Sequence, residues 1–204
     1  MNQEEIYNPL DKINLGESVA DAMLERRPTR LPLTDSFMGA GIYAIYYVGD
    51  LAIYKEIAKR NRRGKFDWPI YVGKAVPAGA RQGGLGLGKD PGDVLFKRIG
   101  EHSHSIEQAG NLQVSDFFCR YLVVDDIWIP LGESLLIETF SPLWNKCLDG
   151  FGNHDPGKGR YGQQRSPWDV LHPGRDWAMR CVENKKSKTQ IVSSVKEFIS
   201  MHVP

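Results

Sequence analysis

Two short apolar stretches, Gly41-Ile-Tyr-Ala-Ile-Tyr-Tyr-Val48 and Pro69-Ile-Tyr-Val-Gly-Lys74, decide the fold. Both are rich in β-branched and aromatic residues, which is typical of buried or half-buried strands. Each carries a tyrosine beside a glycine, Tyr43 in the first stretch and Tyr71 in the second. Paired strands can place two such phenols near one another on one face of a sheet. Gly73, at the end of the second stretch, permits a turn or a close backbone approach.

Length and composition indicate one soluble domain with appendages. The chain has 204 residues, of which 41% are hydrophobic and 25% charged, and these are ordinary values for a globular protein with a real core. No apolar run reaches the length of a membrane span, and the acidic, polar start does not resemble a signal peptide. Three cysteines with no C-x-x-C pair argue against a disulfide framework. We therefore expect reduced cysteines and a cytoplasmic protein.

Outside the two signature strands, the sequence predicts a mixture of helices and one more strand. Apolar periodicity, caps and prolines place helices at about 18–27, 51–62, 93–102 and beyond, 130–140 and 188–201, and a strand at 116–124. Asp93 is the expected N-cap of the helix that follows it. The segment 51–68 is then an insertion between two strands that otherwise pair as neighbours. The segment 149–177 is rich in glycine, basic residues, His and Trp, and a long ordered loop of this kind is often functional.

Six polar residues follow one another along the chain in an order that suggests a site. They are Tyr43, Tyr71, Arg98, His102, Glu133 and Asn145. In this order they resemble the GIY-YIG nuclease superfamily, because Gly-Ile-Tyr stands unaltered at 41–43 and its partner motif appears as Tyr-Val-Gly at 71–73. Arg98-x-x-x-His102 is similar to the Arg/His helix of that family, and 133–145 is similar to its Glu helix and the Pro-x-aromatic-Asn turn. Each motif alone is weak, but four in register are specific.

The resemblance implies both a fold and a subgroup. The expected fold is α+β, a small, mostly antiparallel three-stranded sheet flanked by helices. We expect an N-terminal arm at 1–38, a catalytic core at 39–147 with the inserted helix within 51–68, and a DNA-contacting extension at 148–204. The insertion and the Asp-Gly-Phe-Gly-Asn-His segment at 149–154 resemble the type II restriction endonucleases of the superfamily. Known examples cut GC-rich palindromes such as CCGCGG as homodimers.

The resemblance also implies a phosphodiester hydrolysis in which each site residue has a role. Glu133 is the expected ligand of one Mg²⁺, for which Mn²⁺ can substitute, with phosphate and water completing the shell. Arg98 offers a planar fork to the scissile phosphate. On pKa alone His102 is the more natural proton acceptor, because a free tyrosine has a pKa of about 10. The resemblance favours Tyr43 as the general base, with Tyr71 and His102 assisting, and the choice between Tyr43 and His102 stays open.

We expect residues other than these six to recognise the base sequence of double-stranded DNA. Arginine, lysine and glutamine side chains read base edges in the major groove or hold phosphates. The candidates are Lys74, Arg81, Gln82, Lys158, Arg160, Gln163, Gln164 and Arg165. The resemblance further implies a homodimer and a cognate DNA methyltransferase in the same host that is not a binding partner.

Three other interpretations fit parts of the sequence. One is a GIY-YIG repair or structure-specific endonuclease acting as a monomer on branched or damaged DNA. The second is a catalytically inactive DNA-binding module, against which the retention of all six residues argues. The third takes Asp169 with Glu183 and Lys185 as the D…E-x-K pattern of another nuclease class, but that pattern is short and common by chance.

Overall fold

A four-stranded antiparallel sheet lies at the centre of the computed structural model, which describes residues 8, 10–76 and 91–203. The strands are β1 (Thr29–Arg30), β2 (Gly41–Tyr47), β3 (Tyr71–Ala75) and β4 (Phe117–Val123), in the order β1-β4-β2-β3. The predicted α+β class is confirmed, but the sheet has one strand more than the three predicted. The extra strand β1 has only two residues, both exposed, so it carries no alternating pattern that a sequence analysis could detect.

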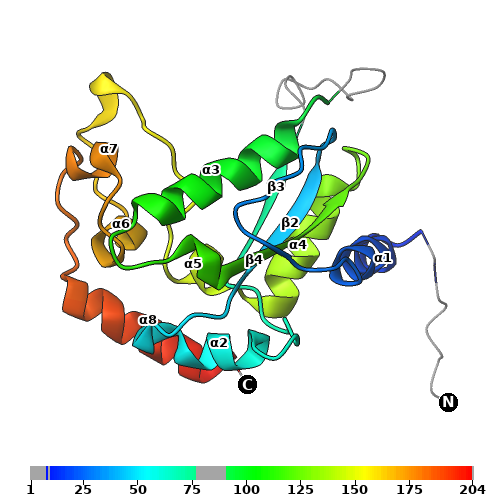
Figure 1. Cartoon of the computed structure of the whole chain (residues 1–204), viewed down its shortest axis with the longest axis horizontal. Helices are drawn as coiled ribbons and strands as arrows, with labels where there is room; N and C mark the ends of the chain where they lie inside the picture. The colour runs from blue at the N-terminus through cyan, green and yellow to red at the C-terminus, as the bar shows by residue number, and fades with distance from the viewer. Residues whose placement is uncertain (1–7, 9, 77–90, 204) are drawn as a thin grey trace, which may run out of the picture.

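Helices surround the sheet at nearly all the positions that the sequence predicts (Figure 1). They are α1 (Lys12–Leu24), η1 (Ala52–Tyr54), α2 (Lys55–Asn61), α3 (Val94–Gln108), η3 (Val114–Asp116), α4 (Ile129–Phe140), α5 (Leu143–Lys146), η4 (Lys158–Arg160), α6 (Pro167–Leu171), α7 (Asp176–Met179) and α8 (Lys188–His202). None of the helices described is long and apolar enough to cross a membrane.

Local signals at the helix ends explain where most of them start and stop. α1 starts earlier than predicted, because the Asp11 side chain accepts the backbone N–H of Ile13 at 3.0 Å and caps it. α4 has Pro130 in its first turn and ends at Phe140, with Ser141 as its C-cap just before a second proline, as predicted. Asp93 is the N-cap residue of α3, as predicted, but its carboxylate pairs with Lys97 at 2.8 Å and makes no capping hydrogen bond.

The two faces of β2 build two separate halves of the core. Tyr43, Ile45 and Tyr47 face α3, together with the helices of the C-terminal segment. Ile42 and its alternate neighbours on β2 instead pack against α1 and α4, which lie side by side (Figure 1). All seven residues of β2 are buried for this reason, and the strand reads as a continuous apolar run rather than as an alternating one.

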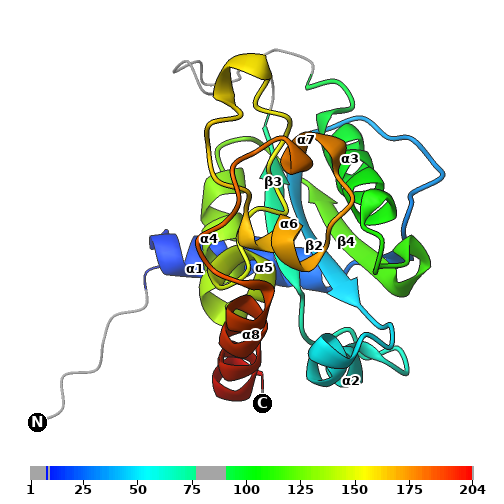
Figure 2. The same ribbon diagram turned by 90° about the vertical axis from the view of Figure 1, so that its left-hand side faces the viewer.

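The segment after Asn145 packs onto the same core as Tyr43. Phe151, Trp168 of α6 and Ile191 of α8 belong to the buried cluster that contains Tyr43. Figure 2 shows α6 and α8 on the viewer's side of β2 and β3. The glycine-rich and basic segment therefore continues into side chains that close one side of the candidate site.

Candidate active site

Tyr43 lies across Gly73, and this contact joins the two signature strands. In the β2–β3 ladder Tyr43 is opposite Gly73, and Ile45 is opposite Tyr71, so both tyrosines are on one face. Their ring centroids are 6.2 Å apart, so the two phenols lie near one another as predicted. A Cβ atom at position 73 would lie 2.5 Å from Oη of Tyr43, so only glycine leaves room for this phenol. The glycine serves a close approach rather than a turn.

His102 completes this pair from α3. Oη of the buried Tyr43 lies 2.6 Å from Nε2 of His102, which is 2% exposed. Burial, reinforced by Tyr71 and opposed by Arg98, raises the pKa of Tyr43 well above its usual value. Burial, with the positive charges of Arg98 and Arg175 and that of His154 when it is protonated, holds the pKa of His102 well below its usual value. Both groups are therefore neutral near pH 7 and share one short hydrogen bond.

Arg98 stands one helical turn before His102 on α3 and approaches the same site. Its Nη2 donates to the backbone oxygen of Gly152 at 3.0 Å, and its Nη1 donates to Glu101 at 2.9 Å. The same Nη1 contacts His154. Arg98 also opposes the burial that raises the pKa of Tyr71. The guanidinium is thus at the edge of the tyrosine cluster, held by groups from α3 and from the C-terminal segment.

Sequence reasoning missed several residues that contact this cluster. The ring of Phe151 is stacked on His102 with centroids 4.4 Å apart at 20°, and it meets Tyr71 edge-on at 4.9 Å. Glu101 and His154 flank Arg98. The i, i+3 spacing of Arg98 and Glu101 on a helix was a usable signal for their pairing. Nothing in the sequence placed Phe151 or His154 beside a helix some fifty positions earlier.

Glu133 and Lys74 form a second polar pair further along β3. Nζ of Lys74 lies 2.6 Å from Oε2 of Glu133, and the two side chains are 38% and 17% exposed. The charge of Glu133 adds to the burial that raises the pKa of Tyr71, which links this pair electrostatically to the tyrosine cluster. Glu138 on the same helix is exposed, as predicted.

The donor set here suits a metal that keeps most of its own shell. Over residues 10–76 and 91–203, no three His, Cys, Asp or Glu side chains gather in a way that could hold a metal ion. Glu133 offers one half-buried carboxylate. Mg²⁺ is commonly held through one or two carboxylates, substrate phosphates and waters rather than by an all-protein cage. Glu133 therefore fits a shared site, and a cage of protein ligands does not fit.

Asn145 acts on the backbone of the outer strand. Its Oδ1 accepts the N–H of Val72 at 2.8 Å, and its Nδ2 donates to the C=O of Val72 at 2.8 Å. β3 is at the edge of the sheet, so Val72 would otherwise present both groups unpaired. Val72 separates Tyr71 from Gly73, and Asn145 thereby fixes the strand that carries three site residues, Tyr71, Gly73 and Lys74.

The expected DNA-contacting residues are in different environments. Arg81 and Gln82 lie outside the described residues. Lys158, Arg160, Gln163 and Gln164 are exposed. Arg165 is half-buried and donates to the backbone oxygens of Ala178 and Met179 at 3.0 and 3.2 Å, so it holds α7 in place.

The D…E-x-K interpretation does not hold, because the carboxylate of Asp169 is used in another interaction. Asp169 is 2% exposed and forms a buried ion pair with Arg175 at 2.7 Å. Glu183 and Lys185 are both exposed. Asp169 therefore serves the packing of the C-terminal segment.

Comparison with known proteins agrees with this geometry. A search of curated proteins finds no match to the chain. A family model described as the Eco29kI GIY-YIG domain matches residues 35–199, well over half of the chain. The match includes all six residues of the predicted site and the segment that carries Phe151 and Arg175. The chain therefore belongs to the Eco29kI GIY-YIG family, a family of type II restriction enzymes.

Proposed function

We propose that this protein is a Mg²⁺-dependent, site-specific endonuclease that cuts both strands of DNA at a GC-rich palindrome. The observation that carries the proposal is the short hydrogen bond between Tyr43 and His102, beside Arg98 and Tyr71, within the residues that the family model matches. A buried phenol and a buried neutral imidazole in contact form a path for a proton, and an arginine beside them suits a phosphate.

Tyr43 takes the proton of the attacking water in this mechanism. Burial disfavours a free phenolate, since it raises the pKa of Tyr43. The hydroxyl proton of Tyr43 therefore passes to Nε2 of His102 as Oη accepts the proton of water. His102 is available as the acceptor because its lowered pKa keeps it neutral. The two side chains that were open alternatives for the base then act in series.

Arg98 and Glu133, which both lie near Tyr71, both act on the scissile phosphate in this mechanism. Arg98 exchanges its present hydrogen bond to Glu101 for bonds to the scissile phosphate as the P–O bond to the leaving oxygen breaks, while Nη2 keeps its hydrogen bond to the oxygen of Gly152. Mg²⁺ held by Glu133, phosphate oxygens and water would neutralise charge on that phosphate. Lys74, which pairs with Glu133 in the free protein, would then be available as a further cation for the DNA backbone.

A palindromic target calls for two copies of this chain. One copy offers one Tyr43–His102 pair, and a two-fold symmetric dimer presents two such sites to two strands. The exposed Lys158, Arg160, Gln163 and Gln164 suit guanine-rich base edges and the flanking phosphates. Gel filtration of the DNA complex that finds one chain per duplex would count against the dimer.

Cleavage of an unmethylated plasmid in Mg²⁺, with the fragment ends sequenced, tests the proposal. We expect discrete bands from the wild type and none from Glu133→Gln. Glu138→Gln is the matched control, because Glu138 is an exposed glutamate on the same helix, and we expect it to cut as the wild type does.

Other outcomes point to the other interpretations. Nicking confined to branched substrates would favour a repair enzyme. DNA binding with no cleavage at any concentration of Mg²⁺ or Mn²⁺ would favour an inactive binding module.

A further inference from the structure

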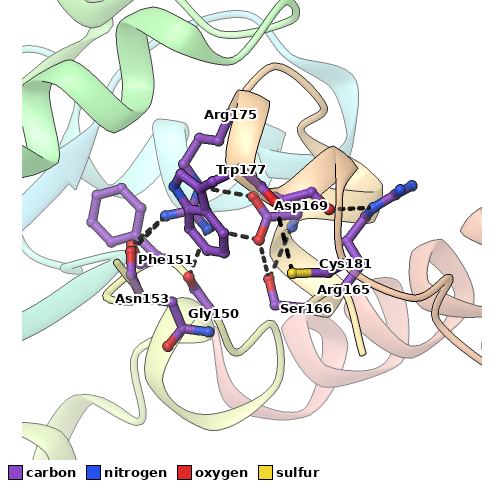
Figure 3. A network of polar contacts seen from close by, with 10 residues as sticks. Gly150, Phe151, Asn153, Arg165, Ser166, Asp169, Arg175, Trp177 and Cys181 are labelled. Carbon is purple, nitrogen blue, oxygen red and sulfur yellow. Dashed lines mark hydrogen bonds and ion pairs between the residues drawn. The ribbon is translucent and has the colours of Figure 1, made fainter. Parts of the chain in front are cut away.

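Arg175 is a fully buried arginine whose hydrogen-bonding capacity is completely used. It is 1% exposed, and it donates five hydrogen bonds, matching the five N–H groups of a guanidinium. Nε and Nη2 grip Asp169 at 2.7 and 2.8 Å. The rings of Trp168 and Trp177 lie over the guanidinium, with centroids 4.6 and 4.7 Å from its carbon. Figure 3 shows the hydrogen bonds that surround Arg175 and Asp169.

The other three hydrogen bonds of Arg175 all go to one turn, at residues 150–153. Nη2 donates to the oxygen of Gly150 at 2.8 Å. Nη1 donates to the oxygens of Phe151 and Asn153, both at 3.1 Å. Gly150 has a φ of +114°, and a Cβ there would collide with Ser166, the residue that donates to Asp169 at 2.7 Å. These three hydrogen bonds to its carbonyl oxygens therefore hold the turn in place.

The same turn also contacts the candidate active site. The remaining carbonyl, that of Gly152, accepts Nη2 of Arg98 at 3.0 Å. The ring of Phe151 is stacked on His102. Three carbonyls of the turn therefore bind a buried arginine, and the fourth binds the arginine of the site.

We propose that Arg175, anchored by Asp169, is a positioning residue that sets the placement of Arg98 and His102 through the turn at 150–153. This inference rests on the function proposed above. A lysine at 175 keeps the charge but has three donors on a flexible stem and no planar fork, so it cannot bind Asp169 and three carbonyls together. Arg175→Lys then loosens the turn without leaving the carboxylate of Asp169 unpaired.

His102 reports on the turn independently of cleavage. The charged and titratable groups around it are Tyr43 and Tyr71 from the sheet, Arg98 from its own helix, and His154 and Arg175 from the C-terminal segment. A loosened turn moves Phe151 off the imidazole and admits water. The pKa of His102 then rises toward its ordinary value, because burial is the largest cause of its depression.

The experiment compares Arg175→Lys with the wild type in three measurements. We expect the single-turnover cleavage rate to fall about 10- to 100-fold, because misplacement of site groups by about 1 Å has effects of that size. We expect the Kd for DNA without metal to change by less than about threefold, since the turn positions the groups that react. In the free protein, an NMR titration of His102 is expected to show a higher pKa.

Arg120→Lys is the matched control. Arg120 also donates to backbone oxygens, those of Arg26 and Phe66, and lies over a ring, that of Tyr46. Its contacts are on the opposite side of the sheet from His102. We expect Arg120→Lys to lower the unfolding temperature but to leave the cleavage rate and the His102 titration unchanged. Equal behaviour of the two variants, measured well below both unfolding temperatures, would overturn the proposal.

A second variant covers the case in which Arg175→Lys does not fold. Trp177 is half-buried and covers one face of the guanidinium, so Trp177→Leu loosens Arg175 while leaving every one of its hydrogen-bond partners. We expect a smaller loss of rate and a smaller rise of the His102 pKa. A wild-type rate and titration in folded Trp177→Leu would overturn the proposal. If the wild type cuts no DNA but the His102 titration still shifts in the variants, the positioning role stands and the proposed function fails.

Discussion

Oη of Tyr54 lies 2.5 Å from Nε2 of His172, so the protein contains a second buried tyrosine–histidine pair in addition to the one in the candidate active site. The direction of this second bond is defined. Asn111 donates its Nδ2 to the oxygen of Leu171 and so presents Oδ1 to Nδ1 of His172 at 2.9 Å. Nδ1 therefore carries the proton, and Nε2 accepts from the hydroxyl of Tyr54.

Tyr54 differs from Tyr43 in what surrounds it. Its oxygen already accepts a hydrogen bond from Nε1 of Trp144 at 3.0 Å, inside an aromatic cluster. Tyr43, which is equally buried, instead lies beside Arg98 and Tyr71. The two pairs thus have the same chemistry but different neighbours, since only the Tyr43 pair lies beside the arginine that we propose binds the phosphate, and this makes them a natural comparison.

Replacing each tyrosine by phenylalanine separates catalysis from folding. We expect Tyr43→Phe to reduce the single-turnover cleavage rate by about 100- to 10,000-fold, since it removes the proton acceptor. Tyr54→Phe leaves two buried nitrogens without their partner and is expected to cost about 1–3 kcal/mol of unfolding free energy. Its cleavage rate, measured well below its unfolding temperature, is expected to match the wild type. If Tyr43→Phe retains most of its rate at saturating metal, Tyr43 is not the base.

Acid is expected to weaken the fold through His172. Burial, with a smaller contribution from Lys188, lowers its pKa to about 3, whereas an unfolded histidine titrates near 6.5. Between these values the unfolded chain binds a proton that the folded protein does not, so stability falls as the pH falls from about 6.5 toward 3. The slope contributed by one such group is about 1.4 kcal/mol per pH unit at most.

Urea unfolding at a series of pH values measures this slope. We expect His172→Gln to be less stable at pH 7 but to lose stability less steeply on acidification. The buried His102 acts in the same direction in both proteins. A wild-type slope in His172→Gln would contradict the assignment.

Lys74 is expected to compete with a metal ion for Glu133. The partly exposed pair, at 2.6 Å, is worth about 1 kcal/mol or less. Lys74→Gln is therefore expected to tighten Mn²⁺ binding to the free protein by up to about fivefold, measured by calorimetry. It is also expected to weaken DNA binding, because a cation is lost. Lys97→Gln removes an exposed lysine from a different carboxylate and is expected to change neither. Weaker Mn²⁺ binding by Lys74→Gln would show that Lys74 does not compete for Glu133.

Most of the fold could be predicted from the sequence, because its signals are local. The two signature strands carry β-branched and aromatic runs, and Pro130 and Pro142 frame α4. Strand β1 was missed because a strand of two exposed residues has no pattern of its own and forms only where β4 offers an edge. Asp93 occupies the N-cap position as predicted, but the same carboxylate can cap a helix or pair with a lysine one turn later, and sequence alone does not rank the two interactions.

The candidate site likewise has a part that the sequence predicts and a part that it does not. Tyr43, Tyr71, Arg98 and His102 meet as predicted, since the sheet register and one helical turn bring them together. Phe151 and Arg175 come from a segment whose composition indicates a functional role but does not indicate which residues the segment contacts. Their places depend on a turn held by long-range hydrogen bonds, for which no periodicity exists. Sequence patterns therefore indicate the candidate reacting groups more readily than the residues that hold them in place.

Asn145 is expected to matter through the strand that it holds. Asn145→Ala removes two hydrogen bonds to Val72 and leaves the N–H and C=O of that residue unpaired, at a cost of about 1–3 kcal/mol of unfolding free energy. The cleavage rate is expected to fall because Tyr71 and Lys74 shift with β3, but by less than in Glu133→Gln. Calorimetric unfolding and single-turnover cleavage on the same samples measure both effects. A variant as stable as the wild type but without activity would instead place Asn145 in contact with the substrate.

The exposed cations of the C-terminal segment are expected to differ in the kind of DNA contact that they make, and salt can distinguish the two kinds. A lysine or arginine that contacts a phosphate releases a counterion, so its removal lowers the slope of log K against log salt by about 0.9 for every sequence tested. Removal of a residue that reads guanine costs about 1–3 kcal/mol on the cognate site and little on other DNA.

We expect Lys158→Gln to show the first behaviour and Arg160→Gln the second, because only arginine can bind guanine through a planar fork. Both side chains are exposed on the short turn η4. Lys196→Gln, on the exposed face of α8, is the control and is expected to change neither the slope nor the affinity. Binding to cognate and scrambled duplexes at four salt concentrations gives all the values required. If Arg160→Gln weakens binding equally on both duplexes, Arg160 holds a phosphate, and the reading of guanine must come from other side chains.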